Sequence, residues 1–425
     1  MPRSIPTDSS SMALSISASP DPAASVDALV VGAGPGGSAV AAALARAGYR
    51  VTAVDRADFP RDKACSEYMS PEAVRLLDRL GVVAELEASG AAAPDGTRVI
   101  GAGGSRLHGR FAGAGVTPFR PTGLAVSRRR LDDALVRAAR GAGAEVVERT
   151  TVEALLYDQG AVAGAVVRDA EGQRRAVRAR LTIGADGLRS LVARRLGPRR
   201  YGHPRRLAFV AHVDRVEEMG NSAELHVGRH GYVGLNPIGG GRTNVALVVP
   251  ATRAGDARGR VEAFFLEALR EFPGLSERVA AGSLARRVLA TGPFAAWSGR
   301  VAADGAALVG DAADFFDPFT GEGIYSALRG AELLAATAAG ALARRGPVTA
   351  ADLAGYRRAR RRAFAGKWAV ERLIGYGMLL PGLFDRAVGR LGRRAGMADT
   401  LIGVTGDFVP ARRVLNPLFL ARMIL

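Results

Sequence analysis

Between residues 26 and 200, apolar residues fall into short runs separated by stretches with helical periodicity. Apolar runs at 27–31 and 51–55 predict two buried strands, and the alanine-rich stretch 36–47 between them predicts a helix. Further helices are expected at 71–80, capped by Ser70 and opened by Pro71, and at 128–140; further strands are expected at 123–126, 145–147 and 181–184. Strand–helix–strand units of this kind build a parallel sheet covered by helices.

Alternation of apolar and polar residues predicts antiparallel strands in other parts of the chain. A three-strand meander is expected from strands at 152–157, 161–168 and 175–180, with turns at 158–160 and 171–172. Alternation returns between residues 205 and 250, most clearly at 223–227, 232–237 and 243–249. This second block predicts a separate antiparallel sheet inserted into the parallel one.

The rest of the chain is predicted to be mainly helical. Residues 258–282 and 322–343 are expected to be helical, and a last parallel strand is expected at 306–309. We therefore expect an α/β protein with four parts: a disordered leader at 1–25, a discontinuous dinucleotide-binding domain at 26–200 and 290–345, a sheet domain at 201–289 that includes part of 82–122, and a helical segment at 346–425.

Composition narrows the class of protein. The 425 residues are 48% hydrophobic and 23% charged, and no apolar run is long enough to cross a membrane. The single cysteine, Cys65, excludes an intrachain disulfide and a multi-cysteine metal site, and fits a reducing cytoplasm. His226 and His230 lie four apart on an expected strand, which is too far apart for metal ligands, so no metal site is expected.

The net charge is +17, and only two of the 58 basic residues are lysines, Lys63 and Lys367. No helix-turn-helix, zinc-finger or RNA-binding signature accompanies this charge, so no nucleic-acid partner is expected. An acidic substrate or an anionic membrane surface fits the charge better.

A glycine motif follows the first expected strand. Gly32, Gly34 and Gly37 form a G-x-G-x-x-G pattern that leads into the helix 36–47, where the backbone can approach a pyrophosphate at the helix N-terminus. Asp55 closes the second strand 23 residues after Gly32, where an acid meets a ribose hydroxyl in dinucleotide-binding folds. The sequence therefore predicts a bound dinucleotide, with FAD and NAD both open at this point.

Two later motifs favour FAD over NAD. Asp186 and Asp311 each lie in an acid–glycine turn after an expected strand. Asp311 can accept a hydrogen bond from a ribityl hydroxyl. The following P-x-T-G-E-G segment opens the helix 322–343, whose N-terminus can stabilise a reduced, anionic flavin.

The order of these motifs resembles that of flavoproteins with the para-hydroxybenzoate hydroxylase fold, over about residues 26–345. The resemblance implies a Rossmann-like FAD-binding domain with an inserted substrate-binding sheet, and one non-covalent FAD. The cofactor contacts expected on this basis are Gly32, Gly34, Pro35, Gly36, Gly37, Asp55, Arg56, Ala64, Cys65, Glu67, Arg128, Val152, Asp186, Gly310, Asp311, Pro318, Gly321, Gly323 and Ile324. Arg128 is included for its R-x-x-L-D-x-x-L pattern; without the resemblance it would be interpreted as part of a solvated basic patch.

The segment 59–71 is similar to the P-x-x-K-x-C-G motif of the geranylgeranyl reductase branch. This resemblance implies catalytic or positioning roles for Lys63, Cys65 and Tyr68, with Tyr68 also a candidate proton donor. Ser66 departs from the branch's glycine.

The branch's Y-x-W-x-F-P strand also changes here: it reads Tyr232, Gly234 and Asn236 where the branch has tyrosine, tryptophan and phenylalanine. Tyr232 and Asn236 are expected to face the substrate. The loss of the two aromatic residues predicts a roomier and more polar pocket.

The expected function is saturation of a carbon–carbon double bond in a hydrophobic isoprenoid or polyketide-like substrate, by hydride transfer from reduced flavin N5. The alternative is a monooxygenase that acts through a flavin C4a-peroxide. A halogenase is disfavoured because Trp297 and Trp368, the only tryptophans, do not form a W-x-W motif. A non-catalytic flavin-binding or membrane-recruitment protein is a further alternative.

Only one dinucleotide fingerprint is present, so NADPH is expected to act transiently or a separate reductase to deliver electrons. The segment 351–425 carries 14 basic and 5 acidic residues. Its helices either pack on the flavin domain with solvated arginines or form a platform for a membrane surface or lipid substrate. The protein is expected to be cytoplasmic, with peripheral membrane contact through this segment left open.

Overall fold

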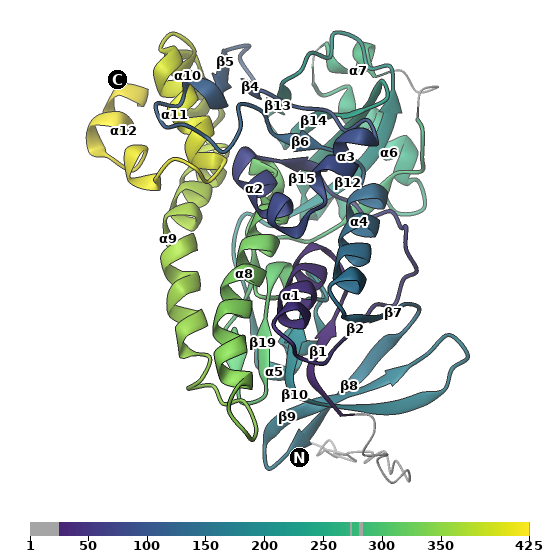
Figure 1. Cartoon of the computed structure of the whole chain (residues 1–425). Helices are drawn as coiled ribbons and strands as arrows, with labels where there is room; N and C mark the ends of the chain where they lie inside the picture. The colour runs from purple at the N-terminus through teal and green to yellow at the C-terminus, as the bar shows by residue number, and fades with distance from the viewer. Residues whose placement is uncertain (1–24, 273, 280–283, 425) are drawn as a thin grey trace, which may run out of the picture.

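The structure is a computed structural model, and it describes residues 25–272, 274–279 and 284–424. The expected leader therefore lies outside the described residues, except for Ser25, which begins the first strand. Figure 1 shows two sheet-containing parts stacked end to end, with a column of helices along one side.

The larger sheet contains the parallel strands predicted from the glycine motif and its surroundings. Its order is β18-β19-β10-β1-β2-β7, with β8 and β9 attached through β10. The strands are β1 Ser25–Val31, β2 Val51–Val54, β7 Glu145–Val147, β8 Thr151–Asp158, β9 Ala161–Arg168, β10 Arg174–Gly184, β18 Ala302–Ala303 and β19 Ala306–Leu308. The separate strands expected at 175–180 and 181–184 are wrong: β10 is one continuous strand, which pairs antiparallel with β9 in its first half and parallel with β1 along most of its length.

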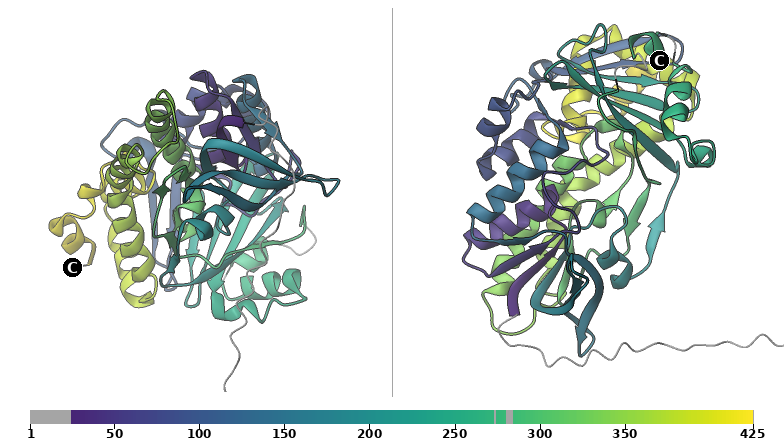
Figure 2. Two further views of the ribbon diagram at one scale, coloured as in Figure 1. Left: turned by 90° about the horizontal axis from the view of Figure 1, so that it is seen from below. Right: turned by 90° about the vertical axis from the view of Figure 1, so that its right-hand side faces the viewer.

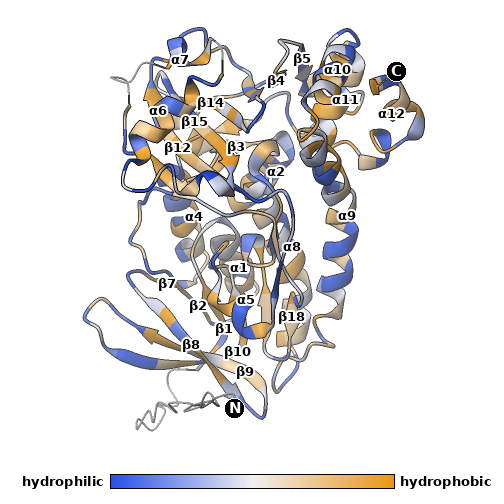
Figure 3. Cartoon of the chain, turned by 180° about the vertical axis from the view of Figure 1, so that it is seen from behind, coloured by the Kyte–Doolittle hydropathy of each residue, from blue (hydrophilic) through white to orange (hydrophobic). Residues whose placement is uncertain are grey.

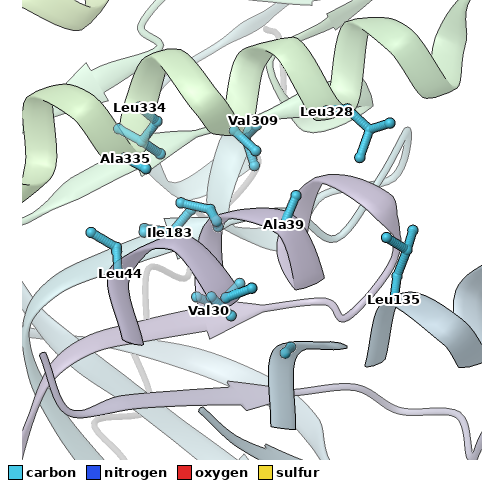
Figure 4. Packing of buried hydrophobic residues seen from close by; sticks show 14 of the residues in the cluster. Val30, Ala39, Leu44, Leu135, Ile183, Val309, Leu328, Leu334 and Ala335 are labelled. Carbon is cyan, nitrogen blue, oxygen red and sulfur yellow. The ribbon is translucent and has the colours of Figure 1, made fainter. Parts of the chain in front are cut away.

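Helices cover this sheet as the alternating pattern predicts. They are α1 Pro35–Arg46, α2 Pro71–Leu80, α3 Val83–Ala88, α4 Arg128–Gly141, α5 Leu191–Leu196 and α8 Gly323–Leu342. Figure 4 shows Ala39 and Leu44 of α1 packed between the strand residues Val30 and Ile183 and the α8 residue Leu334. The predicted cap of α2 is confirmed, since Ser70 Oγ accepts a hydrogen bond from the Ala73 amide.

The second sheet is predominantly antiparallel and has the order β16-β12-β15-β14-β13-β4-β5. Its strands are β4 Gly96–Ile100, β5 Arg106–Arg110, β12 Arg206–Asp214, β13 Ala223–Val227, β14 Tyr232–Gly239, β15 Arg242–Pro250 and β16 Leu289–Thr291. One face packs on α6 Val261–Leu269 and α7 Leu275–Arg278. The single helical stretch expected at 258–282 is thus two short helices in the described residues, separated near Gly274, which has a left-handed backbone.

Short sheets join the two parts. Strands β3 Tyr68–Met69 and β6 Leu124–Ala125 pair with each other, and β17 Ala296–Ser298 lies between β11 Arg199–Tyr201 and β20 Asp314–Phe315. Figure 2 shows in its right-hand view that the second sheet lies at one end of the molecule and the parallel sheet at the other. The segments after β2 and after β19 run between them.

The C-terminal segment forms four helices: α9 Ala354–Gly377, α10 Pro381–Gly392, α11 Ala395–Thr405 and α12 Pro417–Ile424. Figure 3 shows this column beside the sheets, with polar and apolar residues mixed along it. Its upper helices pack on β5 and share a hydrophobic cluster with the second sheet. Within the described residues, no helix combines the length and apolar character needed to cross a bilayer.

Candidate active site

A cavity of about 480 Å³ lies between the two sheets. One end is formed by Gly34 and Pro35 at the start of α1, and the other by the β12, β14 and β15 face of the second sheet. The segment 62–68 and the start of α8 form its sides. The cavity therefore joins the predicted dinucleotide motif to the predicted substrate sheet without an intervening wall.

The glycine motif is tight for steric reasons. A Cβ on Gly32 would lie 2.6 Å from the Ala185 carbonyl oxygen, and Gly32 has a φ of +99°. A Cβ on Gly37 would lie 1.8 Å from the Gly32 carbonyl oxygen. Both glycines shape the turn behind the cavity, whereas Gly34 and Gly36 line the cavity itself.

Three cationic side chains gather where α1 begins. Arg128 forms a two-pronged ion pair with buried Asp132, with bonds of 2.8 and 2.7 Å, and Arg61 Nη1 lies 2.8 Å from the same carboxylate. Burial and the neighbouring Arg128 lower the pKa of Lys63, while Asp311 opposes this shift. Positive charge therefore exceeds negative charge at this end of the cavity. The interpretation of Arg128 as part of a solvated patch is wrong, because its side chain is only 5% exposed.

The predicted acidic residues have different surroundings. Asp55 Oδ2 accepts a hydrogen bond from the Ala33 amide at 2.8 Å, so it fixes the glycine turn. Asp186 Oδ2 accepts from the Leu191 amide and holds the start of α5. Asp311 lines the cavity and faces Lys63; burial raises the pKa of its carboxyl group, with Lys63 acting in the opposite direction.

The N-terminus of α8 opens into the same cavity. Pro318, Gly321, Gly323 and Ile324 line it, as predicted from the P-x-T-G-E-G segment. No side chain caps this helix, and its first turn contains no acidic residue. The free amide groups and the helix dipole thus offer a site for negative charge.

Glu67 is turned away from the cavity, although it was predicted to contact the cofactor. Its carboxylate accepts a 2.8 Å hydrogen bond from the Arg128 amide, and it bonds to His212 Nε2 at 2.6 Å and to Asn244 Nδ2 at 2.9 Å. Glu67 is fully buried and has a φ of +59°. It therefore clamps the 63–71 segment between α4 and the second sheet.

A second clamp joins β14 to the segment that precedes α8. The hydroxyl of Tyr232 donates to Asp317 Oδ1 at 2.5 Å, and Arg206 Nη1 lies 2.8 Å from Asp317 Oδ2. Asn236 Nδ2 donates to the Ser66 carbonyl oxygen at 3.1 Å. Tyr232 and Asn236 both line the cavity, as predicted, but their polar atoms also hold the cavity walls together.

Some of the remaining predicted residues line the cavity, and others lie behind its wall. The lining residues include Arg56, Lys63, Ala64, Cys65, Tyr68, Asp186 and Gly310. Gly32, Gly37, Asp55, Glu67 and Val152 are outside the lining, and Val152 packs against the core behind the parallel sheet. Five residues that shape the site were not predicted from the sequence: Arg61, Arg206, His212, Asn244 and Asp317. Of these, only Asn244 had a local signal, because it and Asn236 are polar residues within two apolar stretches predicted to be adjacent strands.

Behind Glu322 lies a buried polar cluster that the sequence analysis did not anticipate. Lys367 Nζ lies 2.7 Å from Asp407 and 3.4 Å from Glu371, and Ser70 Oγ donates to Glu322 at 3.1 Å. Burial raises the pKa of Glu322 to about 8 and that of Glu371 to about 7, with Lys367 opposing both shifts. The single ammonium group of Lys367 cannot balance the three buried carboxylates of Glu322, Glu371 and Asp407. At least one of these carboxyl groups therefore keeps its proton near neutral pH.

Residues 25–369 match a family described as an FAD binding domain. The chain belongs to this family of flavoproteins. The flavoprotein is 34% identical over 332 residues to a menaquinone reductase of Mycolicibacterium smegmatis, covering 73% of this chain and 75% of the relative. It is 29% identical over 320 residues to a digeranylgeranylglycerophospholipid reductase of Methanosarcina mazei, covering 72% and 73%.

Solved structures agree on the fold. A flavoprotein/dehydrogenase from Cytophaga hutchinsonii matches with a TM-score of 0.81 at 20% identity, covering 93% of this chain and 95% of the other. The myxobacterial chondrochloren halogenase matches with a TM-score of 0.76 at 23% identity, covering 94% and 91%. The predicted para-hydroxybenzoate hydroxylase-type fold is confirmed, and the protein is an FAD-dependent oxidoreductase.

The cavity residues fit FAD. The α1 N-terminus, with Arg61, Lys63 and Arg128 beside it, suits the two phosphates, since these cations outnumber the acids that face them. Asp311 lies between this end and the α8 N-terminus, where a ribityl chain would run. Lys63, predicted as catalytic, lines the cavity beside Arg128 and Asp311, and its catalytic role stays a prediction.

Proposed function

We propose that this flavoprotein saturates a carbon–carbon double bond in a hydrophobic, isoprenoid-bearing substrate. The observation that carries this proposal is the single cavity that runs from the FAD end to an apolar sheet face. Its apolar walls include Ala208, Val210, Leu225, Ala246, Val248, Phe294, Phe315 and Phe319. The names of two relatives, a menaquinone reductase and a digeranylgeranylglycerophospholipid reductase, favour a substrate of this class.

FAD, when bound, supplies the hydride for one alkene carbon. The protein must orient the alkene, exclude water and deliver a proton to the other carbon. Tyr68 lines the cavity, and burial, reinforced by Glu322, raises the pKa of its hydroxyl group, so the hydroxyl stays protonated at physiological pH. We assign Tyr68 the role of proton donor, and Cys65 that of positioning the substrate from the same cavity wall.

The state of Glu322 bears on this transfer. A charged Glu322 disfavours a phenolate on Tyr68, and a neutral Glu322 removes that penalty. Because burial raises the pKa of Glu322 to about 8, the group is mainly neutral at neutral pH. Proton donation by Tyr68 is therefore easiest below about pH 8.

Electrons reach FAD from NADPH bound transiently or from a separate reductase. The chain has one dinucleotide fingerprint, which FAD occupies in this proposal. To separate the two donors, NADPH is added to the isolated protein and the absorbance of the flavin is recorded. Loss of the oxidised-flavin absorbance indicates NADPH, and unchanged absorbance indicates a separate reductase.

The deciding experiment is a single anaerobic turnover. Chemically reduced protein is mixed with a menaquinone or a geranylgeranyl lipid in detergent, and the product mass is measured. Gain of two hydrogen atoms that persists after air has returned any quinol to the quinone, together with flavin reoxidation, supports the reductase. Gain of one oxygen atom, seen only in air, would instead establish the monooxygenase.

A further inference from the structure

Exposed apolar side chains gather on the C-terminal helices. Nine large hydrophobic residues are exposed in the described part of the chain, and six of them lie between residues 373 and 418. Five of these six lie where α9 turns into α10. Leu373 and Tyr376 are on α9, Leu379 and Leu380 are in the turn, and Leu383 is on α10. We call these five residues the leucine edge. Leu418 on the neighbouring α12 is 58% exposed.

Exposed arginines lie on the helices that carry the leucine edge and on the segment that follows them. Arg372, Arg386, Arg412, Arg413 and Arg422 are exposed, and none forms an ion pair with any described residue. Positive charge around an apolar edge is complementary to an anionic phospholipid surface.

The inner sides of the same helices share a hydrophobic cluster with residues of the cavity wall. Met378, Phe384 and Phe419 belong to one hydrophobic cluster with Tyr232 and the cavity residues. In that cluster, Phe315 and Phe319 line the cavity, and Phe319 lies against α9, where a Cβ on Gly375 would be 3.7 Å from its ring. The cluster therefore connects the inner sides of the C-terminal helices to the cavity wall.

Figure 1 places α10, α11 and α12 at the same end of the molecule as the second sheet. A surface that contacts the leucine edge thus lies next to the substrate half of the cavity and away from the α1 end. Isoprenoid lipids reside in the bilayer, and a protein that reduces them must reach them there.

We propose that the leucine edge and its arginines dock this protein on an anionic phospholipid bilayer, where its lipid substrate resides. The proposal rests on the proposed function for its substrate, and on the exposed residues alone for its docking. The arginines are attracted to the anionic surface, and the leucines bury their apolar area in it. Neither contribution alone gives firm attachment, so both are required.

Vesicle flotation of the full-length, FAD-loaded protein tests the docking. Vesicles of phosphatidylglycerol and phosphatidylcholine are compared with phosphatidylcholine alone, at low and high salt. We expect binding to the anionic vesicles that falls steeply with salt. L379Q/L380Q and R412Q/R413Q should each reduce binding at least tenfold.

Matched controls use exposed residues far from the edge. Y157S/Y201S changes two exposed aromatic residues elsewhere, and R174Q/R175Q removes two arginines from β10; both should bind vesicles as the unchanged protein does. Equal flavin content and equal melting temperature show that each variant is folded. Absence of anionic-vesicle binding, or unchanged binding in L379Q/L380Q, overturns the proposal.

Two further measurements separate the remaining outcomes. If L379Q/L380Q converts a dimer to a monomer in light scattering, the edge is a contact between copies and the docking proposal is wrong. Turnover of substrate in detergent should be unchanged in L379Q/L380Q, because detergent removes the need for docking. If docking fails while turnover in detergent is intact, only the docking proposal is affected. If the unchanged protein docks but forms no reduced product, the proposed reaction is wrong instead.

Discussion

The hydroxyl of Tyr232 lies 2.5 Å from Asp317 Oδ1, and together with the Arg206–Asp317 ion pair this bond links the second sheet to the segment that opens α8. Asp317 also caps the turn that follows it, by accepting from the Phe319 amide at 3.3 Å. The substrate wall and the flavin-facing helix are therefore fixed to each other. A ligand that displaces Tyr232 also disturbs the α8 N-terminus.

Tyr232→Phe tests this link, because the ring stays in the cavity wall and only the bond is lost. Asp317 is buried and retains Arg206, so we expect the free energy of unfolding to fall by about 1–3 kcal/mol. Urea unfolding measures the change. Tyr201→Phe is the control: Tyr201 is 57% exposed, and its change should stay within about 0.5 kcal/mol. Equal stability of both variants would show that the Tyr232 bond contributes nothing.

Local signals explain most of what the sequence predicts correctly. The turn at Gly32, the cap at Ser70 and the strand at residues 223–227 each depend on residues close in sequence. Glu67 shows the limit, since its partners His212 and Asn244 lie 145 and 177 residues away. No periodicity in the chain indicates that Glu67, an expected flavin contact, clamps a distant sheet.

The surroundings of Lys63 show the same limit. The motif predicts a catalytic role, which stays a prediction, and the structure places Lys63 beside Arg128 and Asp311. The sequence could not reveal this, because Arg128 and Asp311 approach Lys63 from separate elements. The Lys367 cluster is hidden for the same reason: Ser70, Glu322 and Asp407 come from three segments.

Lys63→Met should weaken FAD binding about tenfold at neutral pH, through loss of a charge-assisted contact. Burial and Arg128 lower the pKa of Lys63 in the free protein, whereas bound phosphates favour its charged form. FAD affinity should therefore fall as pH rises through the lowered pKa of Lys63, and Lys63→Met should lose this dependence. Fluorescence titration of apoprotein with FAD measures both effects. Arg175→Met, an exposed arginine on β10, is the control and should leave the affinity unchanged.

Lys367→Met should destabilise the protein by about 3–5 kcal/mol, because it leaves buried carboxylates without their cation. Removing one acid at the same time, in Lys367→Met with Asp407→Asn, should restore part of this loss. Denaturant unfolding at pH 7 compares the two. If the double variant is less stable than Lys367→Met alone, the cluster is not held by charge balance.

Glu322→Gln should change how stability depends on pH. The native pKa of Glu322 is about 8, above its unfolded value, so the native state binds more protons between these two values. Its ionisation therefore lowers stability progressively as pH rises from about 4.5 towards 8. Glu322→Gln should flatten this decline, and should also remove the loss of turnover above about pH 8. Melting temperatures across pH 5–9 test the first effect, and kcat across the same range tests the second.

The last prediction concerns cavity size at β14. A Cβ on Gly234 meets no atom within 4 Å, whereas a Cβ on nearby Gly231 would lie 2.2 Å from the Val248 carbonyl oxygen. Gly234→Ala should therefore leave stability within about 0.5 kcal/mol, and Gly231→Ala should cost about 1–3 kcal/mol. Gly234→Trp, which restores the aromatic residue of the resembling branch, should fold and narrow the cavity. For a ring-bearing quinone we expect KM to rise about tenfold with kcat little changed, while a linear isoprenoid is affected less. Equal KM changes for both substrates would place the quinone ring away from Gly234.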